Sequence, residues 1–141
     1  QPKSGSATYN GIAHALMFGS RTGARDVAGK AQLRANFDPG AASISGRLSE
    51  LRAGGQPVGY EIVLNPVGFT DAPFAGGGIS IAHEGGASSG AAVYSGDWQG
   101  MFYGEGARAA AGTFTLGATN VPMAGGGTES VQGVGGFGAS R

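Results

Sequence analysis

Two short stretches of the chain decide its fold: WQGMFYG at residues 98–104 and AGTFTLG at residues 111–117. Within each stretch, glycine and large apolar residues recur at every second position, a period typical of β-strands with one buried face. In a narrow barrel, large inward side chains on one strand need a missing side chain on the next strand. The pattern therefore predicts that four glycines make room for three inward rings: Gly100, Gly104, Gly112 and Gly135 for Phe102, Phe114 and Phe137.

The same alternation continues on both sides of these stretches and defines eight strand-like segments. They cover approximately residues 7–17, 28–37, 42–51, 58–64, 77–83, 92–103, 110–116 and 130–139. The alanines of 105–111 are the one place where a short helical turn is expected. An antiparallel sheet protects its edges best by closing, and eight strands leave an interior that side chains can fill. We predict one all-β domain over residues 1–141, an eight-stranded antiparallel up-and-down barrel whose first and last strands pair.

Alternation also predicts which residues share the interior. They are Leu33, Phe37, Ile44, Leu48, Ile62, Leu64, Ile79, Ile81, Phe102, Phe114 and Phe137. In an up-and-down barrel, alternate connections lie at the same end. The connections near 20–25, 54–57, 84–90 and 118–128 should therefore share one rim, and those at 38–40, 66–76 and 105–108 the other, with both termini.

Two connections are rich in apolar residues, and connections of this kind carry binding function in many proteins. Phe69 and Phe74 either plug one barrel end or contact a partner, and the plug is favoured. Val121 and Met123 lie in the other connection, and we expect them to be partner-contact residues.

Composition excludes several function classes. The formal net charge is zero, from nine basic and nine acidic residues, so the chain lacks the electrostatic footprint of a nucleic-acid-binding protein. There is no cysteine for a disulfide, a thiolate metal site or a nucleophile. No apolar run is long enough to cross a bilayer as a helix, so no transmembrane segment is expected.

Motifs of catalytic type lack their required context. The pattern G-x-S-x-G occurs at 86–90, but no helix or later histidine follows it, and G-x-G-x-x-G at 133–138 lies three residues from the last residue of the sequence. His14 and His83 have no carboxylate at ligand spacing, so we predict no metal site. Carboxylates are dispersed, and we predict neither catalytic residues nor a cofactor. Five cations could form a basic face for an anionic partner, although a solvated exterior is favoured: Arg21, Arg25, Lys30, Arg34 and Arg47.

Several segments resemble the transferrin-binding protein B-like β-barrel family of surface lipoproteins, which includes factor H-binding protein and hemophilin-like relatives. The residues that carry this resemblance are Gly100, Phe102-Tyr103-Gly104, Ala107, Gly112 and Phe114, the closing stretch 134–141 with Gly135 and Phe137, the opening stretch 9–13, and the hairpin 27–46. Two features depart from the family pattern. Arg108 and two alanines fill the turn where an acidic residue is usual, and the lipid-carrying cysteine is absent, which leaves membrane anchoring open.

The resemblance implies a non-enzymatic, monomeric binding module exposed outside a Gram-negative cell, secreted or on the outer membrane, with a periplasmic location as the alternative. Its loops would bind a host protein or a nutrient of the iron or haem type. Two other functions remain open: a structural, export-competent unit of a larger surface protein, and a carrier of haem or another small ligand.

Overall fold

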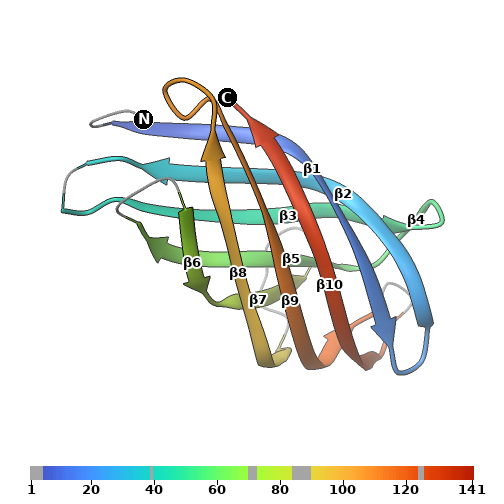
Figure 1. Ribbon diagram of the computed structural model, residues 1–141. Coiled ribbons are helices and arrows are strands. Elements are labelled where there is room, and N and C mark those ends of the chain that lie inside the picture. The colour runs from blue at the N-terminus through green and yellow to red at the C-terminus, as the bar shows by residue number, and fades with distance from the viewer. Residues whose placement is uncertain (1–4, 39, 70–72, 84–89, 124–125) are drawn as a thin grey trace.

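The computed structural model describes residues 5–38, 40–69, 73–83, 90–123 and 126–141, and these form an antiparallel, nearly closed β-barrel (Figure 1). The strands are β1 (Ser6–Gly19), β2 (Gly23–Asn36), β3 (Ser43–Ala53), β4 (Gln56–Pro57), β5 (Tyr60–Gly68), β6 (Pro73–Gly77), β7 (Ile79–His83), β8 (Ala92–Tyr103), β9 (Ala109–Pro122) and β10 (Thr128–Ser140). None of the described residues forms a helix long and apolar enough to cross a membrane.

The sheet order is β6-β8-β9-β10-β1-β2-β3-β5-β7, and β4 pairs only with β3. The predicted pairing of the first and last strands is confirmed, because β1 pairs antiparallel with β10 from Asn10–Ser140 to Gly19–Val131. The predicted interior is confirmed as well: all eleven residues named for it are buried in one hydrophobic cluster.

The prediction of eight strands is wrong, because the described residues form ten strands, nine of them in the barrel. One extra strand arises where the expected segment 77–83 begins earlier, at Pro73, and divides near Gly77. β6 pairs with β8, whereas β7 pairs with β5, so this stretch forms both edges of the sheet, where the barrel nearly closes. The division falls in a run of three glycines, 76–78, which bends readily. The other extra strand is β4, which extends the turn after β3.

The expected helical turn at 105–111 is also absent from the structure. Gly104, Gly106 and Ala107 adopt positive φ angles of 81°, 66° and 54°, which close a tight turn between β8 and β9. The Ala107 carbonyl accepts a hydrogen bond from the buried Tyr9 hydroxyl, which ties this turn to β1.

Glycines do make room for rings inside the barrel, with one change of partner. A Cβ at Gly112 would lie 2.7 Å from the Phe137 ring, and one at Gly135 would lie 2.7 Å from the Phe114 ring. Gly100 instead faces Phe74, also at 2.7 Å. Gly104 serves the turn through its positive φ and does not make room for a ring.

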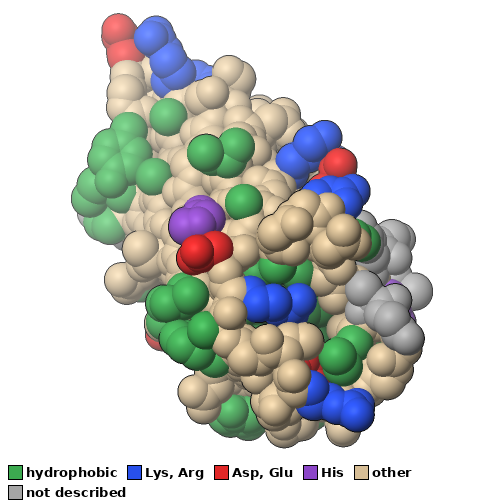
Figure 2. Space-filling model, turned by 90° about the vertical axis from the view of Figure 1, so that its right-hand side faces the viewer, with side chains coloured by type: hydrophobic (Ala, Val, Ile, Leu, Met, Phe, Trp, Pro, Cys, Tyr) green, Lys and Arg blue, Asp and Glu red, His purple; other side chains and the backbone are tan. Residues whose placement is uncertain are grey.

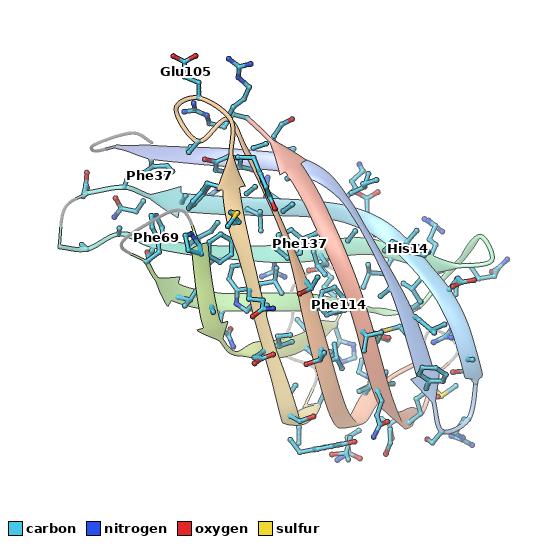
Figure 3. All side chains as sticks on the ribbon, in the orientation of Figure 1. His14, Phe37, Phe69, Glu105, Phe114 and Phe137 are labelled. Carbon is cyan, nitrogen blue, oxygen red and sulfur yellow. The ribbon has the colours of Figure 1, made fainter. Side chains whose placement is uncertain are left out.

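Phe102 lies at the centre of an aromatic cluster near the end of the barrel that holds both termini. Its ring centroid is 5.0 to 5.9 Å from the centroids of four other rings: Tyr9, Phe37, Phe69 and Phe74. Phe69 and Phe74 are both buried, so the plug interpretation is confirmed. Figure 3 shows Phe37 and Phe69 close together at this end of the barrel.

Hydrogen bonds at the two ends agree with the predicted division of the connections. At the terminal end, Asp38 accepts a hydrogen bond from the Gly5 amide, and the Arg108 carbonyl accepts one from the Arg141 amide. At the opposite end, Glu129 accepts one from the Arg21 amide. Residues 84–89 of the connection 84–90 lie outside the described residues.

Gly112→Ala should destabilise the barrel by about 1–3 kcal/mol, because its methyl group would overlap the Phe137 ring and the Gln99 carbonyl oxygen. The matched control is Gly138→Ala on the adjacent strand, where an added Cβ has nothing within 4 Å. We expect this control to leave the free energy of unfolding unchanged or slightly raised. Urea unfolding followed by Trp98 fluorescence measures both, and equal effects would contradict the packing argument.

Phe69→Ala and Phe74→Ala should each lower the free energy of unfolding by about 3 kcal/mol, since each removes a buried ring from the cluster around Phe102. Tyr103→Ala removes an aromatic ring that is half exposed, so it should lower the free energy of unfolding much less. Chemical denaturation measures all three. Near-normal stability of the Phe69 and Phe74 variants would show that the plug is dispensable.

Candidate functional site

The outward faces of β1, β8, β9 and β10, here called the apolar wall, expose an unusual amount of apolar surface. Ile12 is 73% exposed and Val134 is 52% exposed, although both lie in the middle of long strands. The exposed large hydrophobic residues of this wall are Ile12, Leu16, Phe18, Tyr94, Met101, Tyr103 and Val134. Exposed apolar side chains that cluster on one surface often mark interaction sites in soluble proteins.

The apolar wall also carries little charge. Apart from His14, the four strands hold two ionisable charged residues, Asp97 and Glu129, and Glu129 is buried. Asp97 accepts a hydrogen bond from Thr115 on the same wall. The opposite wall, formed by β2, β3 and β5, holds eight charged residues. Figure 2 shows one face of the molecule, on which hydrophobic side chains form several separate groups among polar surface, with Lys and Arg on the same face.

Strand register brings the exposed apolar residues into rows. Leu16 lies opposite Val134, and Ile12 lies in the row that runs through Gly138 and Ala111 to Met101. Glycines in these rows leave the surface low between the apolar side chains. These rows alternate with a polar row that joins His14, Gly136, Thr113 and Gln99, so the apolar side chains lie on adjacent strands with polar groups between them.

One end of the apolar wall is hollowed. A shallow groove of about 490 Å³ lies over β6, β8 and β9, and Met101, Tyr103 and Pro73 line it. Its volume lies within the range of small-molecule and peptide sites. The groove is therefore the place where an apolar side chain of a partner would be most buried.

A second candidate lies inside the barrel mouth, at the end opposite the termini. The buried Glu129 carboxylate accepts hydrogen bonds from the Arg21 and Thr22 amides and from the Thr22 hydroxyl, at 3.0 to 3.2 Å. Arg25 points inward and its Nη2 lies 3.7 Å from Glu129 Oε2. These contacts fasten the β1–β2 turn to β10 and explain why Glu129 is buried.

Two polar atoms at this mouth are buried without a hydrogen-bond partner in the described part of the chain: Arg25 Nε and the Tyr60 hydroxyl. Burial raises the pKa of Tyr60 to about 12; Arg25 partly opposes this rise and Glu129 adds to it. Next to Tyr60, an enclosed cavity lined by Met17, Val27 and Phe114 offers about 10 Å³. That space holds one water molecule at most, so haem cannot enter this cavity.

The predicted partner-contact residues do not form a surface. Val121 is 0% exposed, because β9 continues to Pro122 and directs this side chain into the core, so the expectation of contact at Val121 is corrected. Met123 is partly exposed, and the next two residues lie outside the described part. The remaining motif residues, Phe102, Phe114 and Phe137, are interior packing residues.

Three of the five cations considered for a basic face are in ion pairs. Lys30 pairs with Glu50, Arg47 with Glu61, and Arg25 with Glu129 inside the barrel. His14 and His83 are both exposed, and three strands separate β1 from β7 in the sheet. Among the described residues no group of three or more His, Asp or Glu side chains could hold a metal ion.

Sequence reasoning missed the apolar wall, although a signal was present. Ile12, Leu16 and Phe18 alternate with small inward residues such as Ala13 and Ala15 along β1, so both faces of this strand are apolar.

Comparison with known proteins finds no family model and no curated protein that matches the chain.

The Tyr60 hydroxyl should make stability fall at high pH. The pKa of Tyr60 is raised above the usual value of 10 because the buried site disfavours the ionised hydroxyl. The neutral hydroxyl therefore makes its full contribution to the free energy of unfolding below pH 10, and this contribution is lost as the pH rises towards 12. We expect a loss on the order of 2 kcal/mol over this window. Urea unfolding at pH 9 to 12 measures it. Tyr60→Phe should flatten the profile, whereas Tyr103→Phe, at an exposed site, should not; equal profiles for Tyr60→Phe and the unaltered chain would refute the assignment.

Proposed function

We propose that this chain is a non-enzymatic binding module, exposed outside a bacterial cell, whose apolar wall binds a host protein. The observation that carries the proposal is the exposed apolar surface of β1, β8, β9 and β10, which carries a single outward carboxylate, Asp97. Removing such a surface from water is favourable at about 25 cal/mol per Å², so it is costly to leave uncovered.

The chemistry of the wall supports a protein partner over a small ligand. Protein interfaces are depleted in charged residues at their centre and enriched in aromatic residues and methionine. Tyr94, Tyr103, Phe18 and Met101 have this composition. The groove beside Met101 and Tyr103 is the natural position for an anchoring side chain of the partner.

Other observations favour binding over catalysis. The interior is filled by side chains, the enclosed cavity next to Tyr60 holds one water at most, and the described histidines lie on separate strands. The extracellular location is supported by the resemblance of 98–114 and 134–141 to surface lipoprotein barrels.

The test introduces two charges on the wall with Leu16→Glu and Val134→Glu together. The chain is immobilised, exposed to host serum, and the retained proteins are identified and quantified by mass spectrometry. Burying a carboxylate in an apolar interface is costly, so the double variant should retain at least about tenfold less of any partner.

The matched control is Ala41→Glu with Gln56→Glu, which adds two charges at exposed positions away from the apolar wall. It should retain the partner normally. Full retention by the wall variant would contradict the proposal. If Met123→Ala reduced retention of the partner and the wall variant did not, the binding site would lie on the rim opposite the termini.

A further inference from the structure

The outer faces of β2, β3 and β5, together with the first residues of β1, carry a feature that the proposed function does not use. Two hollows of about 340 and 400 Å³ lie side by side on the outer faces of β1, β2, β3 and β5, and both are lined by Arg34 and Ser45. The two hollows therefore adjoin at Arg34 and Ser45, and together they are here called the Arg34 groove.

A β-bulge accounts for part of this groove. The register of β3 against β5 shifts between Ile44 and Gly46, which leaves Ser45 without a paired residue on β5. Pro66 lies on β5 opposite the shift, lines the groove, and has no amide hydrogen to donate. The two strands therefore part at this point and the surface is hollowed beside Arg34.

Strand register surrounds Arg34 with hydroxyl and amide groups. Thr8 and Ser45 lie opposite it on the two neighbouring strands. The next row toward the terminal end joins Ser6, Asn36 and Ser43. Outward side chains in adjacent strands are about 5 Å apart, which is close enough for several of them to contact one small ligand.

Arg34 is an uncompensated cation in this groove. The neighbouring cations Lys30 and Arg47 are paired with Glu50 and Glu61, whereas Arg34 has no ion pair or hydrogen bond within the described residues. None of the residues that line the two hollows is acidic. A guanidinium group presents donors in a planar fork that matches the two oxygens of a carboxylate, sulfate or phosphate.

From this arrangement we propose that the Arg34 groove binds an acidic saccharide. The guanidinium of Arg34 binds the oxyanion, and the hydroxyl and amide groups of Thr8, Ser45 and Asn36 bind the sugar hydroxyls. This site is centred on β2 and β3 and shares strand β1 with the apolar wall, but it shares none of the exposed large hydrophobic residues of that wall. Either proposal can therefore fail without the other.

The experiment titrates the chain with glucuronate, glucose 6-sulfate, glucose and inorganic sulfate and follows backbone amide shifts by NMR. Saturable shifts centred on residues 6–8, 34–36 and 43–47 are expected with the two acidic sugars, and their relative affinities distinguish carboxylate from sulfate. Glucose and inorganic sulfate should each bind at least about tenfold more weakly, because each supplies half of the contacts.

Arg34→Gln should weaken the binding of both acidic sugars at least tenfold. The matched control is Arg52→Gln, which removes another exposed arginine that has no ion pair with the residues the structure describes and lies outside the groove. It should leave binding unchanged. Equal loss in both variants would mean general charge attraction and overturn the site. Binding of inorganic sulfate as tight as that of the sugars would overturn the saccharide class, and absence of saturable shifts would overturn the proposal entirely.

Discussion

The structure depends on one steric constraint: a narrow closed sheet must fill its interior without overlap between rings. Phe137 faces Gly112, Phe114 faces Gly135, and Phe74 faces Gly100, so each large ring occupies the space that a neighbouring strand leaves empty. Trp98 and Phe102 then complete the packing towards the terminal end, where Phe102 contacts four rings. Interiors packed at this density tolerate little change in side-chain volume, so the glycines are as necessary as the aromatic residues.

A filled interior leaves the outer surface for recognition. The enclosed cavity next to Tyr60 holds one water at most, and the mouth is closed on one side by Glu129 with the β1–β2 turn. What distinguishes this barrel is the contrast between its outer walls. One wall, on β1, β8, β9 and β10, is nearly free of charge, and the other, on β2, β3 and β5, pairs most of its charges and leaves Arg34 in a groove.

Much of the fold could be predicted because period-two alternation assigns each side chain to a face, and every residue named for the interior is buried. The number of strands could not be predicted from the sequence. The stretch from Pro73 to His83 is continuous in sequence, and it divides into two strands only because its halves pair with different neighbours. Val121 was misassigned because an apolar residue between turn-like residues looks the same whether a strand continues or ends. The two surface sites depend on which outward residues adjacent strands bring together, and this register is a property of the folded sheet.

The pairing of β1 with β10 has a mechanical consequence. Asn10 lies opposite Ser140 at one end of this pair and Gly19 lies opposite Val131 at the other, so the outer ends of both strands leave the barrel at the same end, as Figure 1 shows. A force that pulls these two ends apart loads the hydrogen bonds of the pair one after another, in the manner of a zipper, and not all at once in shear. We therefore expect the barrel to open at low force when it is stretched between its two ends, whereas heat and denaturant must disrupt its packed interior as a whole.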